Sequence, residues 1–250
     1  MSVLEVTGLK KHFGGVIAVD DVAFSVAAGE LLALIGPNGA GKTTCFNMLN
    51  GQLRPDDGHI RLGGVDITGA RPRDIWRLGV GRTFQITQTY GSMSVLENVQ
   101  MTLLSYHQRL LSFWSVASAA YRDEAMHLLE QVGMEAQADR GCGVLAYGDL
   151  KRVELAVALA HRPRLLLMDE PTAGMAPRER IELMQLTADL VRRHQVAVLF
   201  TEHDMDVVFT HASQIIVLNR GRIIARGSPE QVRNDPQVRE VYLGSGLMYH

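Results

Sequence analysis

The stretch LLALIGPNGAGKTT at residues 31–44 decides the fold of this chain. Its first five residues are all apolar, which predicts a strand buried on both faces of a sheet. The next nine residues fit the pattern GxxxxGK[ST] and lead into a helix expected over Lys42–Leu49. A strand, a glycine-rich turn and a helix in this order predict an α/β protein that binds the phosphates of a nucleotide.

The loop after this strand supplies the groups that a triphosphate needs. Its glycines let the backbone turn so that successive N–H groups face one anion, and the start of the helix adds partial positive charge. Lys42 is expected to bridge the β and γ phosphates, and the Thr43 hydroxyl to coordinate Mg²⁺. A turn that only joined strand to helix would leave three glycines and a lysine unexplained. The predicted nucleotide-binding residues of the loop are Gly36, Pro37, Asn38, Gly39, Ala40, Gly41, Lys42, Thr43 and Thr44.

The rest of the chain alternates short apolar strands with longer amphipathic helices. Strands expected at Leu165–Met168, Val196–Phe200 and Gln214–Leu218 join the first one in a mostly parallel sheet. The first forty residues alternate apolar and polar positions instead, as in Val3–Val6 and Val22–Val26, which predicts an antiparallel layer. The predicted fold class is therefore α/β, with a P-loop NTPase-like, mostly parallel sheet and an antiparallel β edge layer.

A helical segment is inserted between two strands of the main sheet. Strand signals disappear between Gly81 and His161, where periodicity predicts helices over Ser94–Leu104, Tyr121–Val132 and Gly148–Ala160. We therefore expect a single domain with an inserted helical subdomain. The expected division is residues 1–85 and 161–250 for the core sheet subdomain and residues 86–160 for the helical subdomain.

A pair of acids, Asp169 and Glu170, ends one of the predicted strands. Open α/β sheets bind ligands at the carboxyl ends of their strands, so both side chains are expected beside the phosphates. Asp169 is the natural Mg²⁺ partner, either directly or through a metal-bound water, and Glu170 is placed to polarise a water for in-line attack on the γ-phosphate. The alternative is that the two acids only cap the loop before Pro171. The phosphate-binding loop favours the catalytic interpretation.

With four further features, these motifs resemble the ATP-binding subunit of an ABC (ATP-binding cassette) transporter over nearly the whole chain. Phe13 lies 23 residues ahead of Gly36, where this family stacks an aromatic ring on adenine. Gln85, in the run RTFQ at residues 82–85, matches the glutamine that senses Mg²⁺ and the γ-phosphate and faces the membrane partner. His203 matches the switch histidine that contacts the γ-phosphate.

The fourth feature is LAYGD at residues 145–149, which occupies the position of the family's signature, usually LSGGQ. The resemblance makes Ala146, Tyr147, Gly148 and Asp149 the expected contacts to a nucleotide held by an opposing subunit. Ala146 lacks the serine hydroxyl that normally bonds the γ-phosphate, and Asp149 brings negative charge towards the triphosphate. The N–H of Gly148 and the dipole of the following helix can still bind an anion.

The resemblance implies that ATP hydrolysis works as a switch between two cassettes that meet head to tail. Each ATP is held between one subunit's phosphate loop and the other's signature, and hydrolysis lets the pair reopen. Residues 173–176, AGMA, also lack the aspartate common at this place in the family. We therefore expect a heterodimer with unequal sites, whose cofactors are ATP and Mg²⁺. The expected catalytic residues are Glu170, His203, Gln85 and Lys42, and the expected Mg²⁺ contacts are Thr43, Gln85 and Asp169.

The sequence around the motifs is similar to that of the cassettes of branched-chain amino-acid uptake systems in bacteria. The similar stretches are KHFGG (11–15), RTFQ (82–85), PTAGMAP (171–177) and VYLG (241–244). This implies import of a small solute, such as a branched-chain or related amino acid, powered from the cytoplasmic face of the inner membrane. The implied partners are a second cassette, transmembrane permease subunits and, indirectly, an extracytoplasmic solute-binding protein. Cassettes for urea, amides or other small solutes are the alternative.

Composition and charge weigh against other classes of protein. The 25 Lys and Arg residues against 27 Asp and Glu residues leave a net charge of −2, which gives no reason to expect a nucleic-acid partner. A soluble cassette protein that acts on nucleic acid or ribosomes is disfavoured also because the chain has one cassette and no long heptads. A non-hydrolysing regulator, suggested by Ala146 and Asp149, is disfavoured by Glu170 and His203.

Two smaller features complete the sequence. Cys45 and Cys142 lie far apart without CxxC spacing, which predicts inert packing residues. The eleven uncharged residues Leu110–Ala120 fall short of the roughly 20 apolar residues that a membrane-spanning helix needs. They belong to an extra apolar segment near Leu103–Tyr121. Its Phe113 and Trp114 either receive a coupling helix of the membrane subunit or pack the added helix onto the helical subdomain, and we favour packing.

Overall fold

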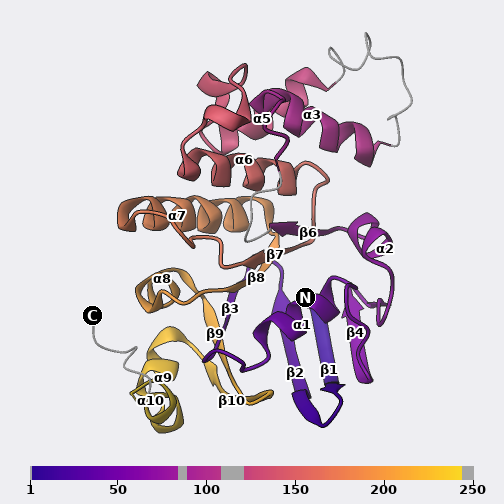
Figure 1. The fold of residues 1–250 in the computed structure, drawn as a ribbon, viewed down its shortest axis with the longest axis vertical. Helices are drawn as coiled ribbons and strands as arrows, with labels where there is room; N and C mark the ends of the chain where they lie inside the picture. The colour runs from indigo at the N-terminus through magenta and orange to yellow at the C-terminus, as the bar shows by residue number, and fades with distance from the viewer. Residues whose placement is uncertain (1, 84–88, 108–120, 244–250) are drawn as a thin grey trace.

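The computed structural model describes residues 2–83, 89–107 and 121–243, and their strands form two sheets (Figure 1). The first sheet is antiparallel, with the order β2-β1-β4-β5, and the second has the order β10-β9-β3-β8-β7-β6. The strands are β1 (Ser2–Phe13), β2 (Val16–Ala27), β3 (Leu31–Ile35), β4 (Asp57–Leu62), β5 (Val65–Asp66), β6 (Val80–Thr83), β7 (Leu165–Asp169), β8 (Ala197–Thr201), β9 (Gln214–Asn219) and β10 (Arg222–Gly227).

The antiparallel sheet confirms the predicted edge layer. Leu4 and Val6 of β1 are buried and Glu5 between them is exposed, as expected for a strand with one face on the core. On β4, Leu62 lies opposite Leu4 and Ile60 opposite Val6, so the apolar side chains of both strands share a face. This sheet holds the phosphate-binding loop from one side.

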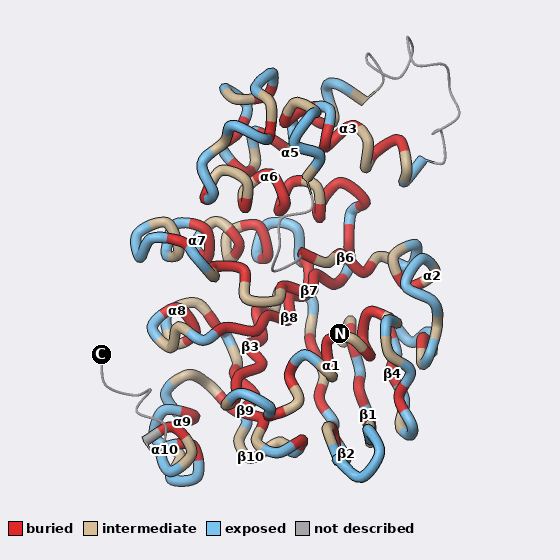
Figure 2. Tube along the Cα trace, viewed as in Figure 1, coloured by how far each residue is buried: buried red, intermediate tan, exposed pale blue. Residues whose placement is uncertain are grey.

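The second sheet is parallel except for β10 and is buried on both faces. All five residues of β3 are buried. Leu32 and Leu34 pack into the core shared with the antiparallel sheet, while Ala33 and Ile35 pack into the core on the opposite face. Figure 2 shows that most residues along these central strands are buried. An uninterrupted apolar run is the sequence that such a strand requires.

Helices cover the parallel sheet, and one group of them, α3, α5 and α6, is inserted between β6 and β7. In Figure 1 this group lies at one end of the molecule, above α7. Helix α3 starts with a reciprocal capping box, in which Ser94 and Glu97 each bond the other's backbone N–H. The α-helices are α1 (Lys42–Leu49), α2 (Pro72–Arg77), α3 (Val95–Tyr106), α5 (Arg122–Gln131), α6 (Tyr147–Leu159), α7 (Pro177–His194), α8 (Met205–His211), α9 (Pro229–Asn234) and α10 (Pro236–Leu243).

The observed elements confirm the predicted fold class and correct some details. The expected loss of strand signals from Gly81 onward is wrong at its start, because residues 80–83 form β6 and pair with β7. The strands β4 and β5 were not predicted either. The expected subdomain boundary near residue 85 lies outside the described residues, so that division stays a prediction.

Two further sequence expectations concern membrane spans and cysteines. Within the described ranges, no helix is both long and apolar enough to cross a bilayer. Cys45 and Cys142 are buried free thiols, as expected for packing residues. Burial raises the pKa of the Cys45 thiol to about 12, so this side chain stays protonated.

Candidate functional site

The phosphate-binding loop joins the end of β3 to the start of α1 in the way the sequence predicts. Gly41 precedes the helix with a φ of 105°, which side chains disfavour, and a Cβ there would lie 2.4 Å from the Ala18 carbonyl oxygen. At Gly36 a Cβ would lie 2.2 Å from the Leu218 carbonyl oxygen. The neighbouring strands β2 and β9 therefore enclose the loop so closely that only glycine fits at both positions.

Lys42 is the first residue of α1, and its side chain folds back over the loop. Its Nζ donates to the carbonyl oxygens of Gly36 at 2.7 Å and Pro37 at 3.2 Å. Burial lowers the pKa of Lys42, and the charges of Glu170 and Asp169 oppose that decrease. The ammonium therefore lies in the field of both acids, although they come from a strand far away in the sequence.

Other loop residues present polar or backbone groups to solvent. Asn38 and Gly39 at the loop's tip are exposed, whereas Ala40 is buried. The hydroxyl-bearing residues Thr43 and Thr44 lie in the first turn of α1, and Thr43 is exposed. The loop, the helix start and a threonine hydroxyl thus lie together, which is the arrangement that binds phosphate with Mg²⁺.

Phe13 lies at the tip of the β1–β2 hairpin and is 50% exposed to solvent. Further along the same hairpin, Ala18 and Val19 lie against Gly41 of the phosphate-binding loop. Lys11 Nζ lies 5.8 Å from the centre of the Phe13 ring, which leaves the ring's other face available for stacking. Phe13 is thus a half-exposed aromatic residue on the hairpin that contacts the phosphate-binding loop, and its stacking on adenine stays a prediction.

The acids Asp169 and Glu170 lie where β7 ends, and Thr201 of the adjacent strand β8 holds both. Thr201 Oγ1 donates to Asp169 Oδ1 at 2.7 Å, and the Glu170 N–H donates to Thr201 Oγ1 at 3.1 Å. Glu170 has a φ of 49°, in the left-handed region that residues other than glycine rarely adopt. Such conformations persist where surrounding bonds enforce them, and they concentrate at functional sites.

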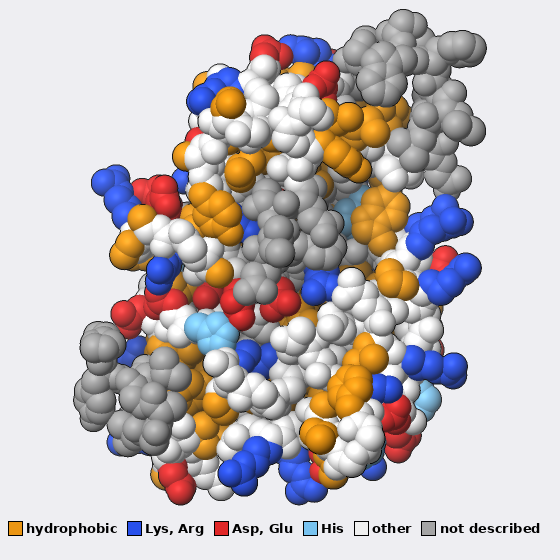
Figure 3. All heavy atoms as spheres, viewed as in Figure 1, with side chains coloured by type: hydrophobic (Ala, Val, Ile, Leu, Met, Phe, Trp, Pro, Cys, Tyr) orange, Lys and Arg blue, Asp and Glu red, His pale blue; other side chains and the backbone are white. Residues whose placement is uncertain are grey.

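His203 and Glu170 meet across the ends of the two strands. His203 Nε2 lies 2.9 Å from Glu170 Oε1, with both side chains partly exposed. Figure 3 shows acidic side chains and a histidine gathered near the middle of the visible face, over the ends of β7 and β8. The geometry can hold a water between a carboxylate and the terminal phosphate, with the imidazole as a second polar contact.

Mg²⁺ would fit here as part of a nucleotide complex. Among the described residues, no three side chains of His, Cys, Asp or Glu lie together as a metal-binding group. Mg²⁺ commonly takes one or two protein oxygens and fills its other positions with substrate phosphates and water. The Asp169 carboxylate and the Thr43 hydroxyl provide such oxygens. Gln85, the third expected Mg²⁺ contact and a predicted catalytic residue, lies outside the described residues.

Arg82 of β6 is a site residue to which the sequence analysis assigned no role. Its Nη2 lies 3.6 Å from Asp169 Oδ2, and its Nη1 donates to Gln52 Oε1 at 2.9 Å. Burial lowers the pKa of this guanidinium, opposed by the charge of Asp169. The pairing depends on β6 lying next to β7, which an isolated reading of the RTFQ run does not reveal.

The signature residues form a second cluster, separate from the phosphate-binding loop. Figure 1 shows α6 with the inserted helices, while α1 lies among the strands on the other side of β7. Asp149 lies in the first turn of α6, as predicted, but the helix begins at Tyr147, one residue before the predicted start, and Ala146 precedes it. Gln137 Nε2 donates to Asp149 Oδ2 at 3.1 Å, and a Cβ on Gly174 would lie 3.6 Å from the Tyr147 ring.

A second acid stands beside the signature. A Cβ placed on Gly148 would lie 3.2 Å from Glu179 Oε1, so the carboxylate of this α7 residue lies against the start of α6. Helix starts attract anions, and here Asp149 and Glu179 supply that negative charge from the protein itself. The structure therefore brings Lys42, Asp169, Glu170 and His203 into one site and leaves the signature residues in another.

Comparison with known proteins adds the family to this geometry. Residues 19–173 match the family model described as ABC transporter, and residues 222–247 match the one described as branched-chain amino acid ATP-binding cassette transporter. The chain is 42% identical over 252 residues to the high-affinity branched-chain amino acid transport ATP-binding protein BraF of Pseudomonas aeruginosa. That alignment covers 97% of this chain and 98% of the relative.

Further similarities extend over similar lengths. The corresponding protein LivG of Escherichia coli strain K12 is 41% identical, with 96% of this chain and 97% of the relative covered. A crystal structure of an ATP-binding cassette of an ABC transporter, in its ADP conformation, superposes with a TM-score of 0.85 at 31% identity. It covers 98% of this chain and 99% of that one, and a nucleotide-free cassette gives the same TM-score.

Proposed function

The chain belongs to the ABC transporter family of ATP-binding cassettes, which are ATPases coupled to transport, and from this premise we propose that it powers the import of branched-chain amino acids. The observation that carries the solute class is the near full-length similarity to BraF, whose name assigns it to branched-chain amino acid transport. The match of residues 222–247 to a model named for the same transporters supports the proposal independently of the nucleotide site.

In the proposed mechanism, the phosphate-binding loop holds ATP by its backbone N–H groups, and Lys42 releases the loop carbonyls to bind the β and γ phosphates. Thr43 and Asp169 would hold the Mg²⁺ that accompanies the nucleotide. This ion would neutralise charge on the phosphates when bound. Phe13 stacks on the adenine ring, so the hairpin and the loop grip opposite ends of ATP.

Glu170 is the proposed general base for hydrolysis. Its carboxylate orients a water in line with the γ-phosphate and takes up the proton that the water loses. His203, 2.9 Å away through Nε2, fixes the carboxylate and contacts the γ-phosphate. The bonds from Thr201 to Asp169 and to the Glu170 N–H keep the metal contact and the base in register. Gln85 is proposed to sense the bound Mg²⁺ and γ-phosphate.

We propose that a second, different cassette completes each nucleotide site. The phosphate-binding loop of this chain lies at the start of α1 and the signature at the start of α6, on separate parts of the fold (Figure 1). The signature lacks a serine hydroxyl at Ala146 and places Asp149 and Glu179 near Gly148, which disfavours a triphosphate there. The competent site therefore pairs this chain's loop with the partner's signature.

A groove between α2, β6, α3 and α6 is the proposed contact with the permease. It encloses about 500 Å³, and its lining includes Trp76, Met101, Val157 and His161. Strand β6 forms part of the lining and ends two residues before Gln85 in the sequence. Motion at the γ-phosphate would pass through this segment to the membrane subunits, which would hold the chain at the cytoplasmic face of the inner membrane. An extracytoplasmic solute-binding protein would join the assembly indirectly.

The heterodimer is tested by measuring ATP hydrolysis with the chain alone and with its paired cassette. We expect slow turnover by the lone chain, because each of its sites would face the degenerate signature, and faster turnover by the mixed pair. Brisk turnover by the lone homodimer would contradict unequal sites.

The transported solute is tested in cells that lack this chain. Uptake of radiolabelled leucine, isoleucine and valine should fall and return with the wild-type chain, but not with Glu170→Gln at the same expression level. Uptake of labelled urea serves as the comparison. Loss of urea uptake with normal leucine uptake would assign the chain to the alternative solute class and refute the amino-acid proposal.

A further inference from the structure

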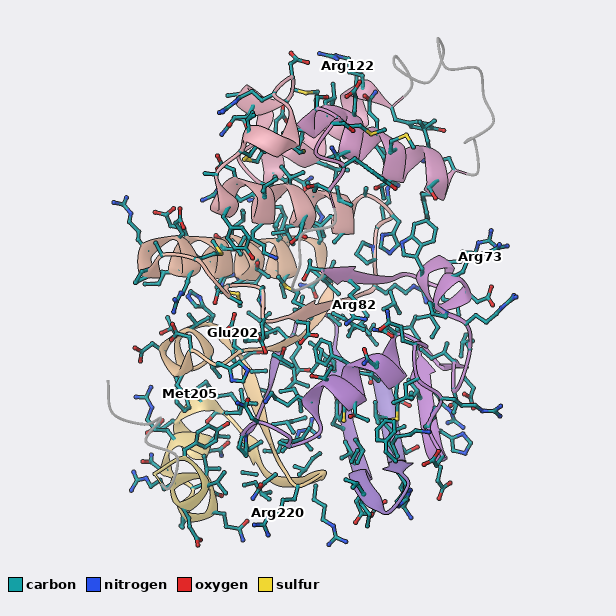
Figure 4. All side chains as sticks on the ribbon, viewed as in Figure 1. Arg73, Arg82, Arg122, Glu202, Met205 and Arg220 are labelled. Carbon is teal, nitrogen blue, oxygen red and sulfur yellow. The ribbon has the colours of Figure 1, made fainter. Side chains whose placement is uncertain are left out.

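Glu202 is a buried acid that stands directly before the proposed γ-phosphate contact, His203. Glu202 follows the last residue of β8 and is only 4% exposed to solvent. Figure 4 labels it next to helix α8. A buried carboxylate is costly unless hydrogen bonds compensate its lost hydration. Its partners therefore indicate what it does.

The Glu202 carboxylate accepts hydrogen bonds from two different loops. Oε1 accepts from the Thr172 N–H at 2.9 Å and from the Thr172 hydroxyl at 2.6 Å. Oε2 accepts from the His203 N–H at 3.1 Å. The loop that follows Glu170 and the loop that carries His203 are thus joined by one side chain, and hydrogen bonds to a charged acceptor are about twice as strong as neutral ones.

A second contact joins the same two loops on the other side of His203. Arg180 of α7 donates through Nε to the Met175 carbonyl oxygen at 2.8 Å and through Nη1 to Asp204 Oδ2 at 2.7 Å. Asp204 also accepts from two backbone N–H groups at the start of α8. Both neighbours of His203 are therefore tied to the segment 172–175.

We propose that Glu202 is a positioning residue for ATP hydrolysis, which ties the backbone of His203 to Thr172 and so keeps the His203 imidazole on the Glu170 carboxylate. The proposal rests on the roles proposed above for Glu170 and His203. Glu202 does not touch the reacting atoms. Its effect reaches them because Thr172 follows Glu170 by two residues, and both ends of the Glu170–His203 contact are thereby fixed to one carboxylate.

The isosteric variant Glu202→Gln separates positioning from packing. An amide has one acceptor oxygen, so whichever way it is turned, its NH₂ group faces an N–H donor of Thr172 or His203. In the assembled transporter we expect kcat for ATP hydrolysis to fall about 10- to 100-fold, because hydrogen bonds to a charged group are lost. ATP affinity should stay within about twofold, since the phosphate-binding loop is untouched.

The matched control is Glu182→Gln, an identical change on the exposed face of α7, where Glu182 pairs with Arg178 and Arg152. It should turn over ATP at the wild-type rate. If the Glu202 carboxylate only stabilised the fold, the Glu202→Gln variant would have a lower melting temperature but an unchanged kcat per folded molecule. Wild-type kcat in folded Glu202→Gln would therefore overturn the proposal.

A second pair of variants keeps the test decisive if Glu202→Gln does not fold. Thr172→Val removes the hydroxyl donor to Glu202 and should lower kcat about tenfold, whereas Thr172→Ser retains the donor and should restore the rate. Equal rates in the two variants would overturn the proposal. A wild-type complex without ATPase activity, or normal turnover in Glu170→Gln, would overturn the proposed function together with this inference.

Discussion

His161 makes the stability of this protein depend on pH in a way that the structure predicts. The residue follows α6, is 3% exposed, and stacks on Trp76 with ring centres 4.9 Å apart. Burial lowers the pKa of its imidazole to about 4. In the unfolded chain the imidazole titrates near a pKa of about 6.5.

The direction of this pH dependence follows from the number of protons bound at His161 in the folded and the unfolded chain. Between pH 6.5 and 4 the unfolded chain binds a proton at His161 that the folded chain does not, so acidification favours unfolding. The contribution is fully present above pH 6.5 and is lost as the pH falls towards 4. Linkage gives a loss of about 2 kcal/mol on going from pH 7 to pH 5, and about 3 kcal/mol below pH 4.

Urea unfolding at pH 7 and pH 5, followed by circular dichroism, measures this loss in the wild type and in His161→Asn. The variant loses the stacking on Trp76 at both pH values, but its stability should fall about 2 kcal/mol less between them. The exposed His127 provides the matched control, because burial is the cause under test and His127→Asn should keep the wild-type dependence. Equal pH dependence in the wild type and His161→Asn would refute the reasoning.

Three substitutions test the nucleotide site. Lys42→Ala should weaken ATP binding about 10- to 100-fold in an equilibrium titration, since it removes hydrogen bonds to charged phosphates, and unchanged affinity would contradict its role. Phe13→Ala should weaken binding about 5- to 100-fold by removing the stacked ring, while Phe13→Tyr retains it. Glu170→Gln should bind ATP, slow phosphate release about 10²- to 10⁴-fold and accumulate a closed dimer in gel filtration; normal turnover would exclude it as the base.

The parallel strands were predictable because their signal is local, but their ends were not. Predicted strands stopped at Met168 and Phe200, the last apolar residues, whereas β7 and β8 continue to Asp169 and Thr201. These two polar residues lie opposite each other in the parallel ladder. Backbone pairing, which depends on the neighbouring strand, decides where a strand ends, and side-chain hydrophobicity alone does not reveal it.

The strands that sequence reasoning missed owe their formation to distant partners. Residues 80–83, VGRT, contain a glycine and an arginine and form β6 through pairing with β7, more than eighty residues later. Asp57–Leu62 has a short alternating pattern and forms β4 through pairing with β1. Tertiary context overrides such weak local preferences. Arg82 reaches Asp169 only because of this pairing, so its place in the site could not be read from the sequence.

The candidate site was predictable to the extent that its motifs are local. The phosphate-binding loop lies within nine consecutive residues. Its glycines at positions 36 and 41 indicate a backbone that leaves no room for a side chain, as the structure shows. Glu202 shows the opposite case, because a glutamate beside a histidine carries no signal of burial. It becomes informative only when Thr172 lies beside it across the strand ends.

The position of β8 explains why so many of these contacts meet at its end. The strand lies between β3, which carries the phosphate-binding loop, and β7, which carries Asp169 and Glu170. The three residues at and after its end make different contacts. Thr201 is hydrogen-bonded to Asp169 and to the Glu170 N–H, Glu202 accepts from Thr172 in the loop that follows these acids, and His203 contacts the Glu170 carboxylate. We infer that a change at the γ-phosphate that moved His203 would act on the Thr172 segment through bonds already present, and would thereby link nucleotide state to the loop leading to α7 within one chain.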